Sequence, residues 1–543
     1  MTDPMAFNSR RAPILGRNGM VATSQPLAVA AGLEVLAQGG NAADAAVATA
    51  AALAVTEPGS TGLGGDCFAL YYETATQQIT ALNGSGRSPA ALSLARLQSE
   101  GLSQELPFDH PYTVTVPGAC AGWVDLVSRH GSLSMNAILA PAIRLAEEGY
   151  PVAPDTAYFW QRAIEGPLGH SLGGQELLVD GHAPSVGEIF RNPGMVRSLQ
   201  TIAQGGITAF YQGGIADAIA RVVQLAGGCL SVEDLAAHTS TWEQPISTTY
   251  HGIQIWECPP NGQGLAVLLA LNILSGYDLP TLAPLSAARL HLEIEAMRLA
   301  FADAAWYVAD PALAPAPVEA LLSDGYAEER RRLINPQQAA PEQQRGFPPV
   351  GSDTVYLTVV DRFGNACSFI NSNYQGFGTG LVPAGWGFSL QNRGHNFSLQ
   401  PDHPNVLAPN KRPYHTIIPA MATRVLDNSL YASFGVMGGF MQPQGHLQVV
   451  VGLVDDNLNP QAALDRPRFC IEPNQPGSKL SLEPGLPDET LADLMVMGHQ
   501  VSVVTGMQRS LFGRGQIITR ESSSGVLWGG SDPRADGCAM CLS

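Results

Sequence analysis

A predicted β-hairpin between residues 354 and 370 is the strongest structural signal in this sequence. Its first strand, residues 354–361, is rich in β-branched residues and begins directly after a polar segment rich in proline and glutamine. A turn at Arg362-Phe363-Gly364-Asn365 leads into a second apolar run at residues 366–370. Thr354 occupies the first position of the hairpin, where it is either an ordinary strand residue or a functional one.

The composition indicates a compact protein with a large interior. Of the 543 residues, 45% are hydrophobic and 14% are charged, and neither a linker nor an internal repeat interrupts the chain. The formal net charge of -18 argues against a nucleic-acid backbone or an anionic membrane as the main partner. Because Lys411 and Lys479 are the only lysines, Schiff-base chemistry has almost no candidates and arginine must bind most anions.

The N-terminal segment and the cysteines carry no targeting or metal signal. Residues 1–18 contain three arginines but no apolar run long enough for a signal peptide, so a cytoplasmic location is predicted. The eight cysteines lack a repeating spacing, and buried free thiols are the default interpretation. Cys538-Ala-Met-Cys541 has no second pair, so we expect no metal and no cofactor.

Two helices and a glycine-rich loop are predicted between residues 24 and 72. Ser24 is a plausible cap for a helix ending near residue 38, and a second, alanine-rich helix runs from Asn41 to about residue 56. Asp44 interrupts this run, which is already too short for a membrane span. The glycine loop at residues 57–66 precedes a strand at residues 67–72. This order is the reverse of a dinucleotide-binding site.

These segments, in this order, resemble the γ-glutamyltranspeptidase family of N-terminal-nucleophile hydrolases. The resemblance also covers residues 116–123, residues 140–149, a long amphipathic helix at about residues 287–309, and Gly435-Val436-Met437-Gly438-Gly439. It implies an α+β fold, a four-layer αββα sandwich with two antiparallel sheets between helical layers, formed by residues 1–543 as one interleaved domain. Thr354 would open a central strand. Residues 530–534 resemble the family's terminal motif, for which a structural role is expected.

The resemblance further implies that the precursor cuts itself between Asp353 and Thr354. The large subunit would be residues 1–353 and the small subunit residues 354–543, held together as a heterodimer that can dimerise further. The segment at residues 334–352 would swing away after cleavage. The new α-amine of Thr354 has an ordinary pKa of about 7.7 to 8.0 and can serve as the base for the threonine hydroxyl.

Several site residues follow from the same resemblance. Ser372 matches the position whose hydroxyl bonds to the nucleophile, and Gly438 and Gly439 match a pair whose amides form the oxyanion hole. Such donors contribute about 3 to 4 kcal/mol each, so no metal is needed. Arg87, in a glycine-rich loop, is either a solvated charge or the anchor of a substrate carboxylate, and we favour the anchor.

The sequence departs from the family at the substrate pocket. Relatives bind the α-amino group of a γ-glutamyl substrate with an asparagine, a glutamine and an aspartate, and its carboxylate with two serines. Tyr374, Arg393 and Asn396 stand at the first three positions, and His415 and Thr416 at the serine pair. Because an arginine repels an ammonium group and the aspartate is lost, the pocket is predicted to bind an anion without a neighbouring amine.

We therefore expect an autoprocessing amidase that hydrolyses, or transfers, the acyl group of a small carboxylate-bearing amide. A true γ-glutamyltransferase or glutathione hydrolase is one alternative. An oxamate amidohydrolase or a glutaryl-type acylase of the cephalosporin-acylase kind is another, and it fits the altered pocket better. The non-enzymatic alternative is an unprocessed relative that serves as a binding or structural protein.

Overall fold

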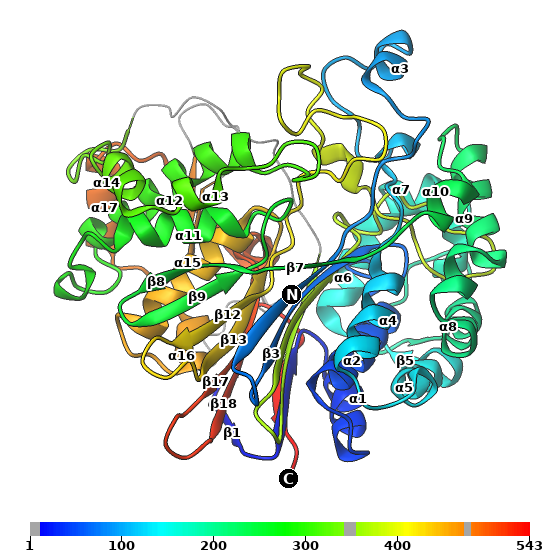
Figure 1. The fold of residues 1–543 in the computed structure, drawn as a ribbon, viewed down its shortest axis with the longest axis horizontal. Coiled ribbons are helices and arrows are strands. Elements are labelled where there is room, and N and C mark those ends of the chain that lie inside the picture. The colour runs from blue at the N-terminus through cyan, green and yellow to red at the C-terminus, as the bar shows by residue number, and fades with distance from the viewer. Residues whose placement is uncertain (1–10, 341–353, 472–478) are drawn as a thin grey trace.

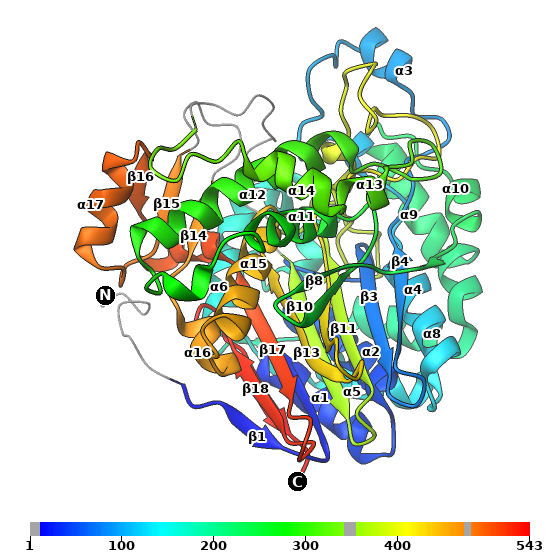
Figure 2. The same cartoon turned by 60° about the vertical axis from the view of Figure 1, so that its left-hand side comes forward.

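The computed structural model describes residues 11–340, 354–471 and 479–543. Within them, two antiparallel seven-stranded sheets lie face to face, with helices over the outer side of each (Figures 1 and 2). The strand order of sheet 1 is β19 (Cys538–Cys541), β2 (Gly19–Thr23), β10 (Val355–Asp361), β11 (Ala366–Ser372), β3 (Asp66–Glu73), β4 (Gln78–Gly84) and β7 (Thr241–Glu243). That of sheet 2 is β1 (Ile14–Gly16), β18 (Leu527–Ser531), β17 (Arg514–Arg520), β13 (Leu430–Met437), β12 (Ala420–Arg424), β9 (Ile253–Glu257) and β8 (Ile246–Tyr250). This arrangement confirms the predicted α+β class and the four-layer αββα sandwich.

Three hydrophobic clusters fill the spaces between the four layers. Sheet 1 packs against α1 (Pro26–Ala37), α2 (Ala42–Thr56) and α4 (Ala119–His130), and α5 (Met135–Glu148) and α8 (Pro193–Tyr211) pack against these helices. Sheet 2 packs against α11 (Gly264–Leu274), α15 (Met441–Val454) and α16 (Pro460–Asp465), and α12 (Ala287–Tyr307) packs against α11 and α15. The third cluster lies between the sheets. Because side chains alternate along a strand, Val355 and Leu357 of β10 face the helices while Tyr356 and Val360 face sheet 2.

The predicted hairpin forms the centre of sheet 1. Strands β10 and β11 pair with each other and, on their outer sides, with β2 and β3. Asp361 stabilises the turn, because its Oδ1 accepts hydrogen bonds from the amides of Phe363 and Asn365. Thr354 directly precedes β10, in the alternation that faces sheet 2.

Of the predictions for single helices, the alanine-rich helix is confirmed, whereas the cap at Ser24 and the amphipathic character of the long helix are wrong. The alanine-rich helix is α2, in which all residues are buried and Asn41 and Asp44 form a capping box. Ser24 is not a helix cap: α1 begins at Pro26, and the Ser24 hydroxyl instead donates to Glu57 at 2.5 Å. Helix α12 is nearly buried on all sides rather than amphipathic, because α11, α15 and α17 (Asp488–Val496) all pack against it.

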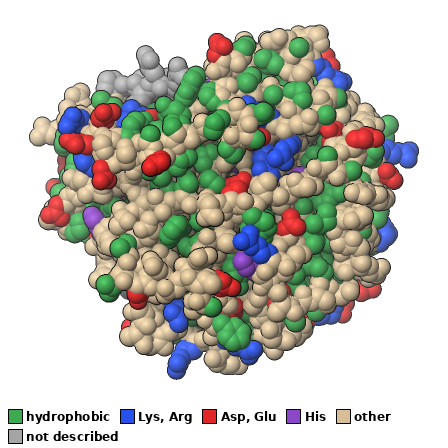
Figure 3. All heavy atoms as spheres, in the orientation of Figure 1, with side chains coloured by type: hydrophobic (Ala, Val, Ile, Leu, Met, Phe, Trp, Pro, Cys, Tyr) green, Lys and Arg blue, Asp and Glu red, His purple; other side chains and the backbone are tan. Residues whose placement is uncertain are grey.

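Smaller elements surround these layers. The helices are α3 (Leu94–Ser99), α6 (Pro154–Ile164), α7 (Pro167–His170), α9 (Gly214–Leu225), α10 (Val232–Ala236), α13 (Val318–Leu321) and α14 (Asp324–Arg331), and the strands are β5 (Tyr150–Pro151), β6 (Ile189–Phe190), β14 (Phe469–Ile471), β15 (Leu480–Leu482) and β16 (Val501–Val503). None of the helices in the described ranges has the length and apolar character needed to cross a membrane. Figure 3 shows acidic and basic side chains scattered over one face of the molecule.

All eight cysteines are free thiols, and five of them are buried. Cys538 and Cys541 lie three residues apart on strand β19, so their side chains point to opposite faces of sheet 1. The pair therefore lacks the geometry of a helical redox motif.

Candidate active site

Thr354 and Ser372 meet where β10 begins and β11 ends. Their hydroxyl oxygens are 3.0 Å apart, and both side chains are fully buried. The register of the hairpin explains this contact, because Val355 pairs with Asn371 and the flanking residues are therefore adjacent. Ser372 Oγ also accepts hydrogen bonds from the Tyr374 amide at 2.8 Å and from Arg393 Nη2 at 3.2 Å.

Arg393 is a buried guanidinium beside this pair of hydroxyls. It begins the short 3-10 helix Arg393–Asn396 and is 0% exposed. Its Nη1 donates to Thr416 Oγ1 at 2.6 Å, so its hydrogen bonds go to hydroxyl groups rather than to a carboxylate. Its Nε has no acceptor among the described residues, and burial lowers its pKa to about 10. A buried cation with this set of partners is well suited to an anionic ligand.

Tyr374 and Asn396 form the adjoining wall. The Arg393 guanidinium lies 4.3 Å from the centre of the Tyr374 ring, and the Tyr374 hydroxyl donates to Asn396 Oδ1 at 2.6 Å. Asn396 Nδ2 donates in turn to the Tyr414 carbonyl at 3.1 Å. Tyr374 has a φ of +77°, a conformation that costs a bulky residue about 1 to 3 kcal/mol and is often found at functional sites.

His415 lies next to Thr416 but is bonded to a residue that sequence reasoning missed. Its Nε2 donates to Asp66 Oδ2 at 3.0 Å, and both side chains are 0% exposed. Asp66 is the last residue of the predicted glycine-rich loop and the first residue of β3. Its position at the end of that loop was the only signal in the sequence, because its partners come from three distant segments.

The Gly438-Gly439 turn follows β13 in sheet 2. Both glycines have positive φ angles, +133° and +62°, which an L-residue rarely adopts. Gln263 connects this turn to the other residues, since its Nε2 donates to the carbonyls of Gly439 and Thr416 at 2.9 and 2.6 Å. Gln263 was also missed by the sequence analysis, because a lone glutamine carries no recognisable pattern.

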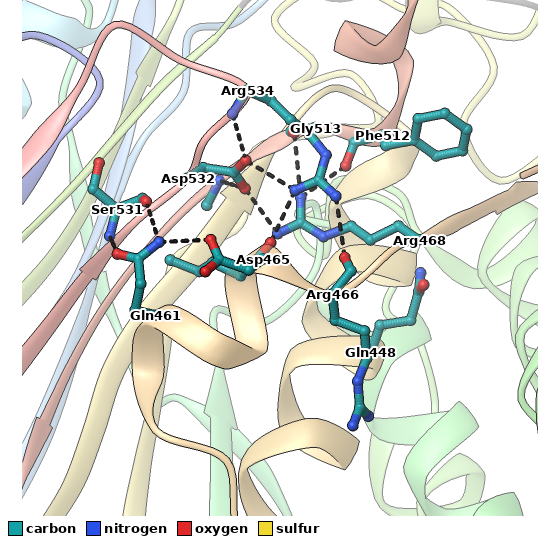
Figure 4. A network of polar contacts seen from close by, with 12 residues as sticks. Gln448, Gln461, Asp465, Arg466, Arg468, Phe512, Gly513, Ser531, Asp532 and Arg534 are labelled. Carbon is teal, nitrogen blue, oxygen red and sulfur yellow. Dashed lines mark hydrogen bonds and ion pairs between the residues drawn. The ribbon is translucent and has the colours of Figure 1, made fainter. Parts of the chain in front are cut away.

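A buried arginine network surrounds Gly513, a neighbour of this turn (Figure 4). Arg468 donates to Asp532 and to the carbonyls of Phe512 and Gly513, and Arg534 also pairs with Asp532. Gly513 packs directly against Gly438, leaving 3.1 Å between its Cα and a Cβ added at Gly438. The terminal motif at residues 530–534 therefore makes the structural contacts expected of it.

Among the predicted site residues that the structure describes, Arg87 is the one whose side chain has no contact with this group in the described part of the chain. Its side chain is half-buried, and its carbonyl accepts a hydrogen bond from the Val116 amide. The neighbouring Gly86 amide donates to Asp66 Oδ1 at 3.0 Å, so Arg87 lies one residue from the cluster. The peptide bond at Asp353 lies outside the described residues, as do residues 341–352 of the predicted loop.

One group with metal-ligand chemistry is formed by distant residues and could not be seen in the spacing. His291, Glu295 and His499 are buried and close together, with His291 Nδ1 2.8 Å from His499 Nε2. Other contacts already use the Glu295 carboxylate: Oε1 accepts from Arg298 at 2.5 Å and Oε2 from the Ala340 amide at 3.2 Å. The group therefore forms a hydrogen-bonded network between α12 and the segment before β16.

Comparisons with known proteins identify the family. The model for gamma-glutamyltranspeptidase matches residues 28–542. The chain is 36% identical to the glutathione hydrolase-like YwrD proenzyme of Bacillus subtilis over 97% of this chain and 99% of that one, and 33% identical to the oxamate amidohydrolase proenzyme of Klebsiella pneumoniae over 96% and 98%. The crystal structure of cephalosporin acylase from Bacillus halodurans superposes with a TM-score of 0.91 and 45% identity, covering 100% of this chain and 99% of that one. This protein is therefore an enzyme of the gamma-glutamyltranspeptidase family, with the N-terminal-nucleophile hydrolase fold and amidohydrolase relatives.

Proposed function

We propose that this protein is an autoprocessing amidase in which Thr354 is the nucleophile. The observation that carries the proposal is the 3.0 Å contact between the hydroxyls of Thr354 and Ser372 at the start of the central strand. The proposed cut at Asp353–Thr354 divides the chain into residues 1–353 and 354–543, which stay together as a heterodimer. The relatives named above as proenzymes support such maturation.

The proposed chemistry needs one residue for two roles. The α-amine of Thr354, freed by cleavage, accepts the proton of its hydroxyl while Oγ1 attacks the amide carbonyl. The amides of Gly438 and Gly439 donate to the oxyanion, and the ammonium returns the proton to the leaving amine. Water activated by the same amine then hydrolyses the acyl ester. An amine acceptor in place of water would give transfer instead.

The proposed substrate is a small amide that carries a carboxylate but no neighbouring ammonium group. Arg393 supplies the buried positive charge, with Tyr374, Asn396, His415 and Thr416 around it. Arg87, the residue after Gly86, is proposed as a second cation for the same carboxylate. Each charged hydrogen bond is worth about 1.5 to 3 kcal/mol. Oxamate and glutaryl amides meet this description, and the names of two relatives point the same way.

A γ-glutamyl amide such as glutathione is the second candidate, favoured by the name of the relative from Bacillus subtilis. Its ammonium group would lie near Arg393, which disfavours it. A cytoplasmic location remains part of the proposal.

The test combines intact-mass analysis with a panel of amides. We expect two chains that meet at Asp353–Thr354, together with turnover of glutaryl or oxamate-type amides that exceeds turnover of the matching γ-glutamyl amide by roughly tenfold. An intact chain of 57.2 kDa would contradict the proposed self-processing at Asp353–Thr354. A clear preference for the γ-glutamyl amide would identify a γ-glutamyl hydrolase.

A further inference from the structure

Asp66 is a buried carboxylate on the strand next to Ser372, whose hydroxyl contacts the proposed nucleophile Thr354. It is the register partner of Ser372 across β3 and β11, and residues paired in this way project to the same face of a sheet. Phe68 and Leu70, the next residues of that face, belong to the cluster between the two sheets. Asp66 and Ser372 therefore lie side by side at one end of the space between the sheets.

In this structure Asp66 accepts hydrogen bonds through both carboxylate oxygens. Its Oδ1 accepts from the amides of Gly86 and Gly118 at 3.0 and 3.2 Å, and its Oδ2 accepts from His415 Nε2 at 3.0 Å. His415 Nδ1 accepts from the Ile417 amide at 3.4 Å, which places the proton of a neutral imidazole on Nε2. Burial and the charges of Arg393 and Arg412 keep the pKa of His415 well below its ordinary value. The imidazole therefore does not neutralise the carboxylate.

Among the described residues, no carboxylate is bonded to the Arg393 guanidinium. Asp66 is the acid whose charge acts on it most strongly, raising its pKa against the effect of burial. In return, burial raises the pKa of Asp66 to about 6, and Arg393 opposes that rise. The charge of Asp66 also raises the pKa of three other groups. Cys67 and Tyr211 are neutral because their pKa values are raised. Arg412 is already paired with Glu243 at 3.7 Å.

We propose that Asp66 is the internal counter-charge of Arg393 before substrate binds, and that a substrate carboxylate takes over this role when it binds. A bound anion would repel the Asp66 charge and favour its protonation, so binding takes up about one proton. Asp66 would thereby determine how tightly the site holds an anion without touching the reacting atoms. This inference rests on the proposed carboxylate site at Arg393, but not on the amide chemistry at Thr354.

The first test uses the wild-type protein and glutarate, which has no amide to cleave. Calorimetric titration in two buffers of different ionisation enthalpy measures the protons taken up. We expect uptake approaching one proton near pH 7, and an affinity that falls as the pH rises above about 6, by at most tenfold per unit. The sign follows because ionised Asp66, which predominates above its pKa, repels the incoming anion. Binding without proton uptake, or no binding of glutarate, would overturn the inference.

The second test uses Asp66→Asn, with neutral glutaramide as a comparison ligand. Removing the competing charge should tighten glutarate binding by about tenfold and abolish proton uptake, while glutaramide binding changes little. Asp303→Asn is the matched control, because Asp303 is buried and pairs with Arg330 in a different part of the chain. Asp303→Asn should leave glutarate binding unchanged.

Equal weakening of the binding of both ligands by Asp66→Asn would show that Asp66 has a structural role only. Should Asp66→Asn fail to fold, the wild-type proton uptake decides. Proton-linked glutarate binding without amide turnover would refute the amidase proposal alone.

Discussion

Ser372 links the proposed nucleophile to the buried guanidinium of Arg393, so its removal should affect both. Ser372→Ala leaves the Tyr374 amide and Arg393 Nη2 without this acceptor, a cost of about 1 to 3 kcal/mol each. We expect kcat/KM to fall by roughly ten- to a hundredfold, measured with the best amide of the panel. Ser368→Ala is the control, since Ser368 lies on the same strand and face but bonds to Tyr356. An equal loss of kcat/KM in both variants would contradict the assignment.

Arg393 should decide between carboxylate and ammonium groups. Arg393→Gln removes the charge and restores the residue type that γ-glutamyl-binding relatives carry. The preference for a glutaryl over a γ-glutamyl amide should therefore shrink by roughly tenfold, as the ratio of the two kcat/KM values. Arg393→Lys keeps the charge and should retain most of the preference. A ratio that Arg393→Gln leaves untouched would show that the acyl pocket lies elsewhere.

The turn after β13 is the element on which the proposed oxyanion hole depends. Gly438→Ala places a Cβ at a φ of +133° and within 3.1 to 3.3 Å of Gly513 and Met441, so the turn must shift. Because donor geometry matters most in the transition state, kcat should fall by about tenfold or more with little change in KM. Gly252→Ala is the control: its φ is +85°, and its Cβ would meet no atom within 4 Å. If Gly252→Ala lowered kcat equally, the loss would be due to general strain.

Elements with a strong local pattern were predictable, and contacts between distant segments were not. The hairpin and α2 were predicted because β-branched runs, a turn and an alanine-rich stretch act locally. The cap at Ser24 was wrong because Glu57, far along the chain, competes for its hydroxyl. Asp66 and Gln263 were missed because only the tertiary fold brings them to the site. Arg393 was identified by resemblance, but only the structure shows that its guanidinium is bonded to hydroxyl groups and, within the described ranges, to no carboxylate.

At the scale of the whole molecule, catalysis should not depend on a metal. The proposed chemistry uses an amine, a hydroxyl and backbone amides, and none of these needs a Lewis acid. Dialysis against a chelator should leave turnover unchanged, with metal content measured before and after. Stoichiometric metal lost together with turnover would contradict the proposed mechanism. Loss of metal without a change in turnover would show that the metal has a structural role. The first residues to substitute in that case are His291, Glu295 and His499, whose side chains could hold a metal ion.

The two chains expected after cleavage should be inseparable without unfolding. In sheet 1, β10 and β11 lie between β2 and β3, and in sheet 2, β12 pairs with both β13 and β9, so each sheet contains strands from both sides of Thr354. The wild type should therefore show two bands on a denaturing gel but a native mass of at least 57.2 kDa, and both chains should unfold in one transition.

Thr354→Ala should remain one inactive chain with the same fold. Thr358→Ala, on the same face of β10, is the control and should still be cleaved into two chains. Cleavage of Thr354→Ala at the same bond would remove Thr354 from its proposed role in self-processing.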